Sequence, residues 1–282
     1  LLQNLRCDEF VPAPVVFEGS APAAFATAPF VARLRAGEVA PGTVLLGQPV
    51  SIDDACAVQF RRQSGSHLLI VGMNAESAES ILRSVIYSLV KNPVRRGRVI
   101  MVDLALRADE PERFGASAEW LGEDLEIVSP RQLVSLLAGW RERMEEPRQE
   151  EVYLAFFGLH RARDIQPHDD FGGLSMSFSD EPAPATPGQQ LGDLLREGPE
   201  HGIHVLAWCD SAPNLTRRVS APTVREFEMR VLFQMSLQDS LALTDSPAAS
   251  RLGLGRAVFT SDELGRQETF KPYAVAARVT DA

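Results

Sequence analysis

Residues 67–87 (HLLIVGMNAESAESILRSVIY) have the frame of a phosphate-binding loop: a short apolar strand, a glycine and an amphipathic helix. A working loop reads G-x-x-x-x-G-K-[ST], in which the Lys reaches the β- and γ-phosphates and the hydroxyl binds Mg²⁺. Counted from Gly72, this chain has Ser77 in place of the second Gly, Ala78 in place of the Lys and Glu79 in place of the Ser or Thr. A carboxylate repels a triphosphate, and no Lys neutralises it. The segment therefore predicts a strand–turn–helix that does not hydrolyse nucleotide.

The length and composition indicate one large globular domain or two small ones. The chain has 282 residues, and its 45% hydrophobic and 23% charged residues are ordinary for a globular fold. No apolar run reaches membrane-spanning length, so we expect no membrane partner and a cytoplasmic location, at most peripheral to a membrane-tethered assembly. The chain begins without Met and without a signal sequence, and we interpret it as a piece of a longer polypeptide.

The net charge disfavours nucleic acid as a direct ligand. It is −10, whereas non-specific binding of the phosphate backbone depends on clustered Lys and Arg. The local exception is the basic group Lys91, Arg95, Arg96 and Arg98. We interpret it as a solvated helix end, with a phosphate or nucleic-acid contact as the alternative. The three cysteines, Cys7, Cys56 and Cys209, lie far apart without metal-ligand spacing, which predicts buried or incidental thiols.

Composition divides the chain into three parts. Residues 1–40 are rich in Ala, Pro and Gly and predict a linker or N-terminal extension, residues 41–276 the domain, and residues 277–282 a tail. Inside the domain, residues 166–189 are rich in Asp, Ser, Pro and Gly and predict a long loop.

Within residues 41–276, apolar runs bounded by turn residues predict the strands. Expected strands are residues 43–50, 68–71, 98–103, 125–128, 151–157, 203–209 and 229–235, with a closing hairpin of 256–260 and 268–273. Helices are expected after residue 72, from residue 130 to about 144, and from 187 to 197. Short apolar strands separated by helices predict an α/β fold with a parallel sheet covered on both faces.

The last third of the chain carries the most specific pattern. GPEHGIHVLAWCDS and REFEMRVLFQMSLQDSLALTDSPAASRLGLGRAVFTSDELG resemble the core of the FtsK/SpoIIIE family of RecA-like motor ATPases. The matching positions, in order, are Gly202, Ile203, His204, Arg230, Ser236, Asp239, Ser240, Pro247, Ala248, Leu252 and Gly253. Order and spacing hold from about Gly65 to Phe259. The family comprises DNA translocases, conjugation proteins and EccC-type motors of type VII secretion.

The resemblance implies a RecA-like P-loop fold: a mostly parallel, twisted sheet flanked by helices, with an antiparallel edge at the C-terminus. It also shows departures at the active-site positions. The Walker B strand of the family ends in adjacent acids, and EVYLAFFGLHRARD places Phe157 and Gly158 there. The family's sensor residue falls at Cys209 and Asp210. Losing these groups together removes the charge compensation on which phosphoryl transfer relies.

These departures predict a pseudo-ATPase: a catalytically degenerate motor module, with no catalytic residue, no metal and no cofactor. We expect it to be the C-terminal interaction or regulatory part of a larger translocase. Its crevice, at Gly72, Asn74 and Asp103, is expected to hold no positive charge and no acid that binds Mg²⁺. Expected partners are sister ATPase modules of the same polypeptide or ring, and a protein substrate or regulator. DNA is expected to contact the whole assembly rather than this module.

Two alternatives remain open. In the first, the chain is an active ATP-dependent translocase of DNA or protein with non-standard ligands. In the second, it is a nucleotide-sensing module that binds ATP and Mg²⁺ without hydrolysis. Asp103, at the end of its strand, is a surrogate metal ligand or a turn cap, and the cap is favoured.

The basic residues after the degenerate Walker B strand are candidates for an interface. For His160, Arg161 and Arg163 a solvated loop is favoured, and the alternative is a contact with a neighbouring subunit's nucleotide or with DNA. Arg230 is a further candidate for the interface.

Overall fold

A continuous β-sheet forms the centre of the molecule. The computed structural model describes residues 23–51, 55–107, 109–146, 150–167, 184–276 and 278–279. In these residues the strands are β1 (Ala23–Ala24), β2 (Thr43–Pro49), β3 (Cys56–Gln59), β4 (Leu68–Val71), β5 (Arg98–Asp103), β6 (Leu125–Ile127), β7 (Val152–Phe157), β8 (Ile203–Cys209), β9 (Met229–Leu232), β10 (Ala257–Ser261) and β11 (Arg266–Ala274). Their order is β3-β2-β11-β10-β9-β4-β8-β7-β5-β6, and β1 pairs with β11.

The sheet is parallel on one side and antiparallel on the other. Strands β9, β4, β8, β7, β5 and β6 pair in parallel, whereas β9, β10, β11, β2 and β3 form antiparallel pairs. Every residue of β4, β7 and β8 is buried, as expected where helices cover both faces of a parallel sheet. The predicted fold class is confirmed.

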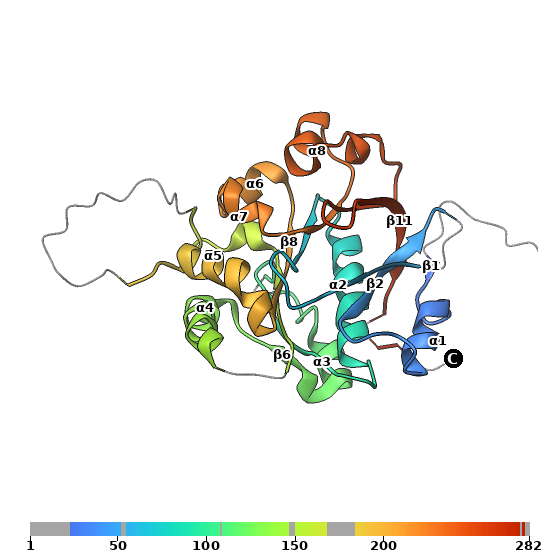
Figure 1. Cartoon of the computed structure of the whole chain (residues 1–282), viewed down its shortest axis with the longest axis horizontal. Coiled ribbons are helices and arrows are strands. Elements are labelled where there is room, and N and C mark those ends of the chain that lie inside the picture. The colour runs from blue at the N-terminus through green and yellow to red at the C-terminus, as the bar shows by residue number, and fades with distance from the viewer. Residues whose placement is uncertain are drawn as a thin grey trace, which may run out of the picture.

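Helices cover both faces of the sheet. They are α1 (Pro29–Arg35), α2 (Ala75–Val90), α3 (Gly115–Leu121), α4 (Leu133–Glu142), α5 (Pro187–Glu197), α6 (Ala212–Thr216), α7 (Ala221–Arg225) and α8 (Leu237–Thr244). Alternate residues of β4 enter two separate cores: Leu68 and Ile70 pack in the core that contains α2, and Leu69 and Val71 in the core that contains α4 and α5. Figure 1 shows α4 and α5 on one side of the sheet and α1, α2 and α3 on the other.

Most predicted elements are present, with shifts at their ends. The strand expected at residues 229–235 ends at Leu232, and the helix expected from residue 130 begins as a 3₁₀ turn before α4. Residues 23–40, expected in a linker, pack on the domain. Phe25, Val31 and Leu34 form a third core with Tyr87 of α2. Residues 168–183 of the expected long loop, and residues 280–282 of the expected tail, lie outside the described residues.

A charged cluster ties strands together at the amino edge of the sheet. The Glu151 carboxylate contacts Arg62 Nε at 2.9 Å, Arg95 Nη2 at 3.1 Å and His204 Nε2 at 3.3 Å. Burial acts to raise the pKa of Glu151, but the hydrogen bonds and charges of His204 and Arg62 outweigh it and lower the pKa to about 2. The ionised carboxylate therefore stabilises the folded chain.

We predict that Glu151→Gln lowers the free energy of unfolding at pH 7 by about 1–2 kcal/mol, allowing for the solvent exposure of the arginines. The pKa of Glu151 is lower in the folded than in the unfolded chain. The stabilisation is therefore complete above the unfolded pKa, near 4.5, and is lost as the pH falls toward 2. Urea unfolding of the unchanged chain and of Glu151→Gln at pH 7 and near pH 3 measures this difference in the free energy of unfolding. An equal difference at both pH values would contradict this assignment.

Candidate functional site

The register of the parallel strands brings the predicted site residues to one edge of the sheet. At the carboxyl ends of the strands, Val71 pairs with Cys209, Phe157 with Trp208, and Asp103 with Phe157. Strand β8 therefore lies between the strand that precedes the loop and the degenerate Walker B strand. In open α/β sheets this edge is where ligands bind.

The loop after β4 is too short to surround a phosphate. The phosphate-binding pattern places five residues between its first Gly and the Lys. Here helix α2 begins at Ala75, so only Met73 and Asn74 separate it from Gly72. Three of the first four amides of the helix have partners. Ala75 N donates to Met73 O at 3.0 Å, Ser77 N to Asn74 Oδ1 at 3.0 Å, and the next amide, of residue 78, to Asn74 O at 3.0 Å. Asn74 therefore caps the helix and occupies amides that would bind a phosphate.

Gly72 is held to strand β8. Its N–H donates to Cys209 O at 3.0 Å, and its carbonyl accepts a hydrogen bond from Trp208 Nε1 at 3.0 Å. Its φ of +135° lies in a region that favours glycine, and a Cβ there would stand 2.7 Å from Phe233 Cβ. The first residue of the loop is therefore fixed by protein groups on both sides.

An arginine bridges the two carboxylates of the crevice. Arg113 Nη1 lies 3.1 Å from Glu79 Oε2, and Arg113 Nε lies 3.2 Å from Asp103 Oδ2. Arg83 also contacts Glu79, at 2.6 Å, across one turn of α2. The expectation of a crevice without positive charge is wrong, because the Arg113 guanidinium lies between these carboxylates. Arg113 comes from the segment between β5 and α3. Its charge is matched by carboxylates of this chain, so it is not free to neutralise a triphosphate.

Aromatic side chains fill the Walker B position. The rings of Phe157 and Trp208 lie 4.4 Å apart between centroids, and the Arg113 guanidinium lies 4.9 Å from the Phe157 centroid. Gly158 has a φ of +90°, and a Cβ at this position would approach Ala105 Cβ to 2.8 Å. An acid at residue 158 would therefore require the backbone to move.

Asp103 serves as a turn cap and as a partner of Arg113. It is 4% exposed, and its Oδ1 accepts a hydrogen bond from Ala105 N at 3.0 Å. Burial raises the pKa of Asp103, although the charge and hydrogen bond of Arg113 oppose this effect. The cap agrees with the favoured interpretation of this residue.

His160, Cys209 and Asp210 form a second polar group at the same edge, next to Trp208. Asp210 N donates to His160 Nδ1 at 3.3 Å, and His160 Nε2 lies 3.6 Å from Asp210 Oδ2. Burial lowers the pKa of His160, partly offset by Asp210, so the imidazole is neutral at pH 7. Burial likewise raises the pKa of the Cys209 thiol to about 12.

The other predicted interface residues differ in exposure. Arg161 and Arg163 lie at the surface, as an interface would require. Arg230 is buried, and its Nη1 donates to Leu243 O at 2.8 Å, so its assignment to an interface is wrong.

The basic group after α2 is paired within the chain. Its arginines contact acids on neighbouring segments: Arg95 contacts Glu151, Arg96 contacts Asp124, and Arg98 contacts Glu126. Lys91 lies over the ring of Trp120 at 4.9 Å. The helix-end interpretation fits these contacts better than a phosphate site does.

Arg113 and Trp208 are the site residues that the sequence did not reveal. Arg113 lies outside every motif, in an irregular segment without periodicity. Trp208 stands inside a continuous apolar strand, where an aromatic residue predicts only burial. The sequence feature that could have pointed to Arg113 is the carboxylate at residue 79, because a partly buried carboxylate needs a cationic partner.

Comparison with solved structures shows the fold. The pCW3 conjugation coupling protein TcpA, determined with ATPγS, matches 83% of this chain and 66% of its own at 14% identity and a TM-score of 0.61. The cytoplasmic domain of the type VII secretion ATPase EccC from Thermomonospora curvata matches 93% of this chain and 33% of its own at 14% identity, TM-score 0.59. The structure of EccC ATPases 2 and 3 from Thermomonospora curvata in complex with a signal sequence peptide matches 85% of this chain and 42% of its own at 12% identity and a TM-score of 0.59.

The chain therefore has the RecA-like P-loop fold that these ATPases share, and it spans a third to two thirds of their length. No family model matches it. No curated protein matches it either. Among the described residues, no helix combines the length and the apolar character needed to cross a bilayer.

We predict that Arg113→Ala lowers the free energy of unfolding by about 2–3 kcal/mol, because it leaves Asp103 buried without its cation. The matched control is Arg107→Ala, which removes an exposed arginine paired with Asp109 at 3.7 Å and should change stability by less than about 0.5 kcal/mol. Denaturant unfolding of the three proteins measures the effect. Equal stability of the two variants would show that the bridge contributes nothing.

Proposed function

We propose that this chain is a catalytically degenerate motor module that works by binding other proteins. It keeps the RecA-like P-loop fold and does not hydrolyse nucleotide. In a translocase assembly it packs against sister ATPase modules and serves as an interaction or regulatory part.

The observation that best supports this proposal is that the carboxylates beside the loop are already paired with Arg113. Arg113 joins Glu79, at the hydroxyl position of the phosphate-binding pattern, to Asp103 at the end of β5. For ATP–Mg²⁺ to enter, this bridge would have to break. The triphosphate would then face two carboxylates without a Lys to compensate them.

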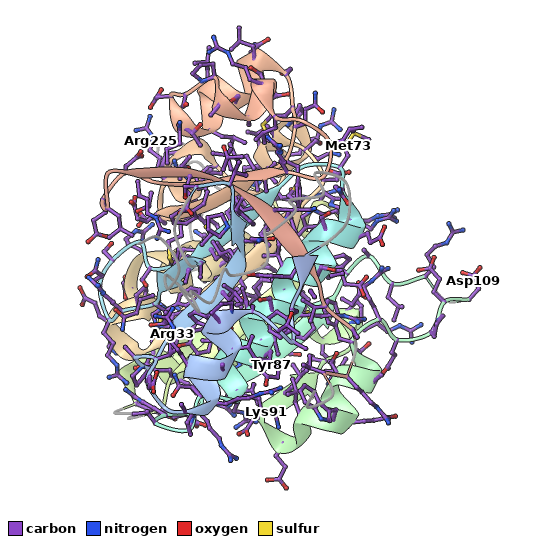
Figure 2. All side chains as sticks on the ribbon, turned by 90° about the vertical axis from the view of Figure 1, so that its right-hand side faces the viewer. Arg33, Met73, Tyr87, Lys91, Asp109 and Arg225 are labelled. Atoms are coloured by element: carbon purple, nitrogen blue, oxygen red, sulfur yellow. The ribbon has the colours of Figure 1, made fainter. Side chains whose placement is uncertain are left out.

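The surface around the loop supports a docking role. Met73 is 86% exposed and Leu254 is 92% exposed. A groove of about 260 Å³ is lined in part by Asn74, the neighbour of Met73, and by Gly255, the neighbour of Leu254. Figure 2 shows Met73 at the outline of the molecule. Large exposed apolar side chains next to one groove are typical of an interaction surface.

The compared structures support the same role. EccC contains several ATPases in one chain, and one of its structures holds a signal sequence peptide. A module of this fold can therefore stand beside sister modules and bind a protein segment. We extend this arrangement to the present chain.

We predict that the isolated chain gives no saturable heat with ~1 mM ATP–Mg²⁺ in calorimetry, releases no phosphate, and is not stabilised thermally by the nucleotide. Duplex DNA should not change these results. Binding without turnover would instead support the nucleotide-sensing alternative. Turnover stimulated by DNA, with a steep dependence on salt, would support the active translocase.

The docking surface has a separate test. Met73→Asp combined with Leu254→Asp should abolish co-elution with the catalytic modules of the same assembly, because it places two charges in an apolar contact. Val94→Asp is the matched control, since Val94 is 58% exposed but precedes β5, at the opposite edge of the sheet. An unchanged complex with the double variant would exclude this surface.

A further inference from the structure

Three metal-binding side chains meet beside Trp208. His160 follows the degenerate Walker B strand, and Cys209 and Asp210 end the neighbouring strand β8. One ligand atom from each residue lies within 4.8 Å of the other two. The group is assembled from two segments 50 residues apart, which explains why spacing along the sequence did not reveal it.

The distances are near those of a coordinated ion. His160 Nε2 is 3.6 Å from Asp210 Oδ2, and Cys209 Sγ is 4.0 Å from Asp210 Oδ1. Ligand atoms around a tetrahedral Zn²⁺ lie about 3.3–3.6 Å apart, given metal–ligand distances of about 2.0–2.3 Å. One donor atom of each residue lies within 4.8 Å of the other two, so each pair would have to close by at most about 1.5 Å to reach this spacing.

Further residues already orient the Asp210 carboxylate. Asn214 Nδ2 lies 2.9 and 3.1 Å from its two oxygens, and Ser211 Oγ donates to Oδ1 at 3.0 Å. A carboxylate that binds a metal is usually held in this way by outer hydrogen bonds. The two hydrogen bonds to Oδ1 use both of its lone pairs, whereas Oδ2 retains one for a metal ion. Asp210 is therefore positioned by its neighbours before any ion binds.

We propose that His160, Cys209 and Asp210 bind one Zn²⁺ ion. A thiolate, an imidazole and a carboxylate are the donor set that zinc accepts, and Asp210 is partly exposed, so water completes the fourth position. As the Zn–S bond forms, the Cys209 S–H bond breaks and its proton leaves to solvent. The thiolate and the carboxylate then balance the two charges of the ion.

Three features oppose binding. Burial raises the pKa of the Cys209 thiol to about 12, so the proton that leaves as the Zn–S bond forms is held more tightly than in a free thiol. The ring nitrogen that takes the ion gives up its contact with Asp210, at 3.3 Å for Nδ1 or 3.6 Å for Nε2, and both contacts are long for hydrogen bonds. Arg218 donates from Nε to His160 O at 3.0 Å and brings a positive charge nearby. For the site to bind, the bonds that Zn²⁺ forms with the thiolate, the imidazole and the carboxylate must outweigh all three effects.

The bound ion would join the loops that follow β7 and β8. It would thus brace the crevice edge of a module that lacks the residues for Mg²⁺ and phosphate. This role does not depend on the proposed docking function, because it concerns only the described residues of this edge.

The test is titration of the metal-free, reduced chain with Co²⁺ and then Zn²⁺. We expect one equivalent of Co²⁺ to give a thiolate-to-cobalt charge-transfer band, and Zn²⁺ to displace it. Cys209→Ser should abolish the band, whereas Cys56→Ser and Cys7→Ser should retain it. Cys56 is a matched control, because it is also a buried free thiol.

Asn214→Ala keeps the test decisive should Cys209→Ser prevent folding. This variant retains all three ligands and loses only the outer hydrogen bonds, so the affinity for Zn²⁺ should fall about 10–100-fold. Absence of Co²⁺ and Zn²⁺ binding by the folded chain would overturn the proposal. A charge-transfer band that survives Cys209→Ser would do the same.

Discussion

The Arg113 guanidinium controls the character of the crevice. It lies between Glu79 of α2 and Asp103 of β5, over the ring of Phe157, and so joins a helix, two strands and the segment before α3. Without a cation, the two carboxylates would face each other across a partly buried space, which is costly. With it, the charges are matched within the chain. The crevice is therefore stable without the phosphates and the metal ion that balance charge in a working motor.

The fold survives the loss of these ligands because its stability has another source. Strands β4, β7 and β8 are buried along their whole length, and helices cover both faces of the sheet. The edge that binds nucleotide in an ATPase thus remains in place as a rigid frame. Its amides are used by the Asn74 cap, and its surface presents exposed Met73 and Leu254.

The buried strands and the longer helices could be predicted from the sequence, and the shortest helices could not. The buried strands and α2 follow from apolar runs and helical periodicity. The helices α6 and α7 have five residues each, too few for a periodic signal, and tertiary packing holds them. The assignment of Arg230 to an interface failed for a different reason. Arginine is mostly exposed in proteins, but here a carbonyl of α8 accepts its hydrogen bond in the interior.

The sequence by itself determined what this site lacks. The residues at positions 78, 79, 157 and 158 show that these positions hold neither the Lys and the metal-binding hydroxyl nor the paired acids of the family pattern. Only the tertiary structure decided what stands there instead. Arg113 meets Glu79 from 34 residues away, and His160 meets Asp210 from 50 residues away. Partners of this kind are set by strand order and register, because those decide which distant side chains share one edge.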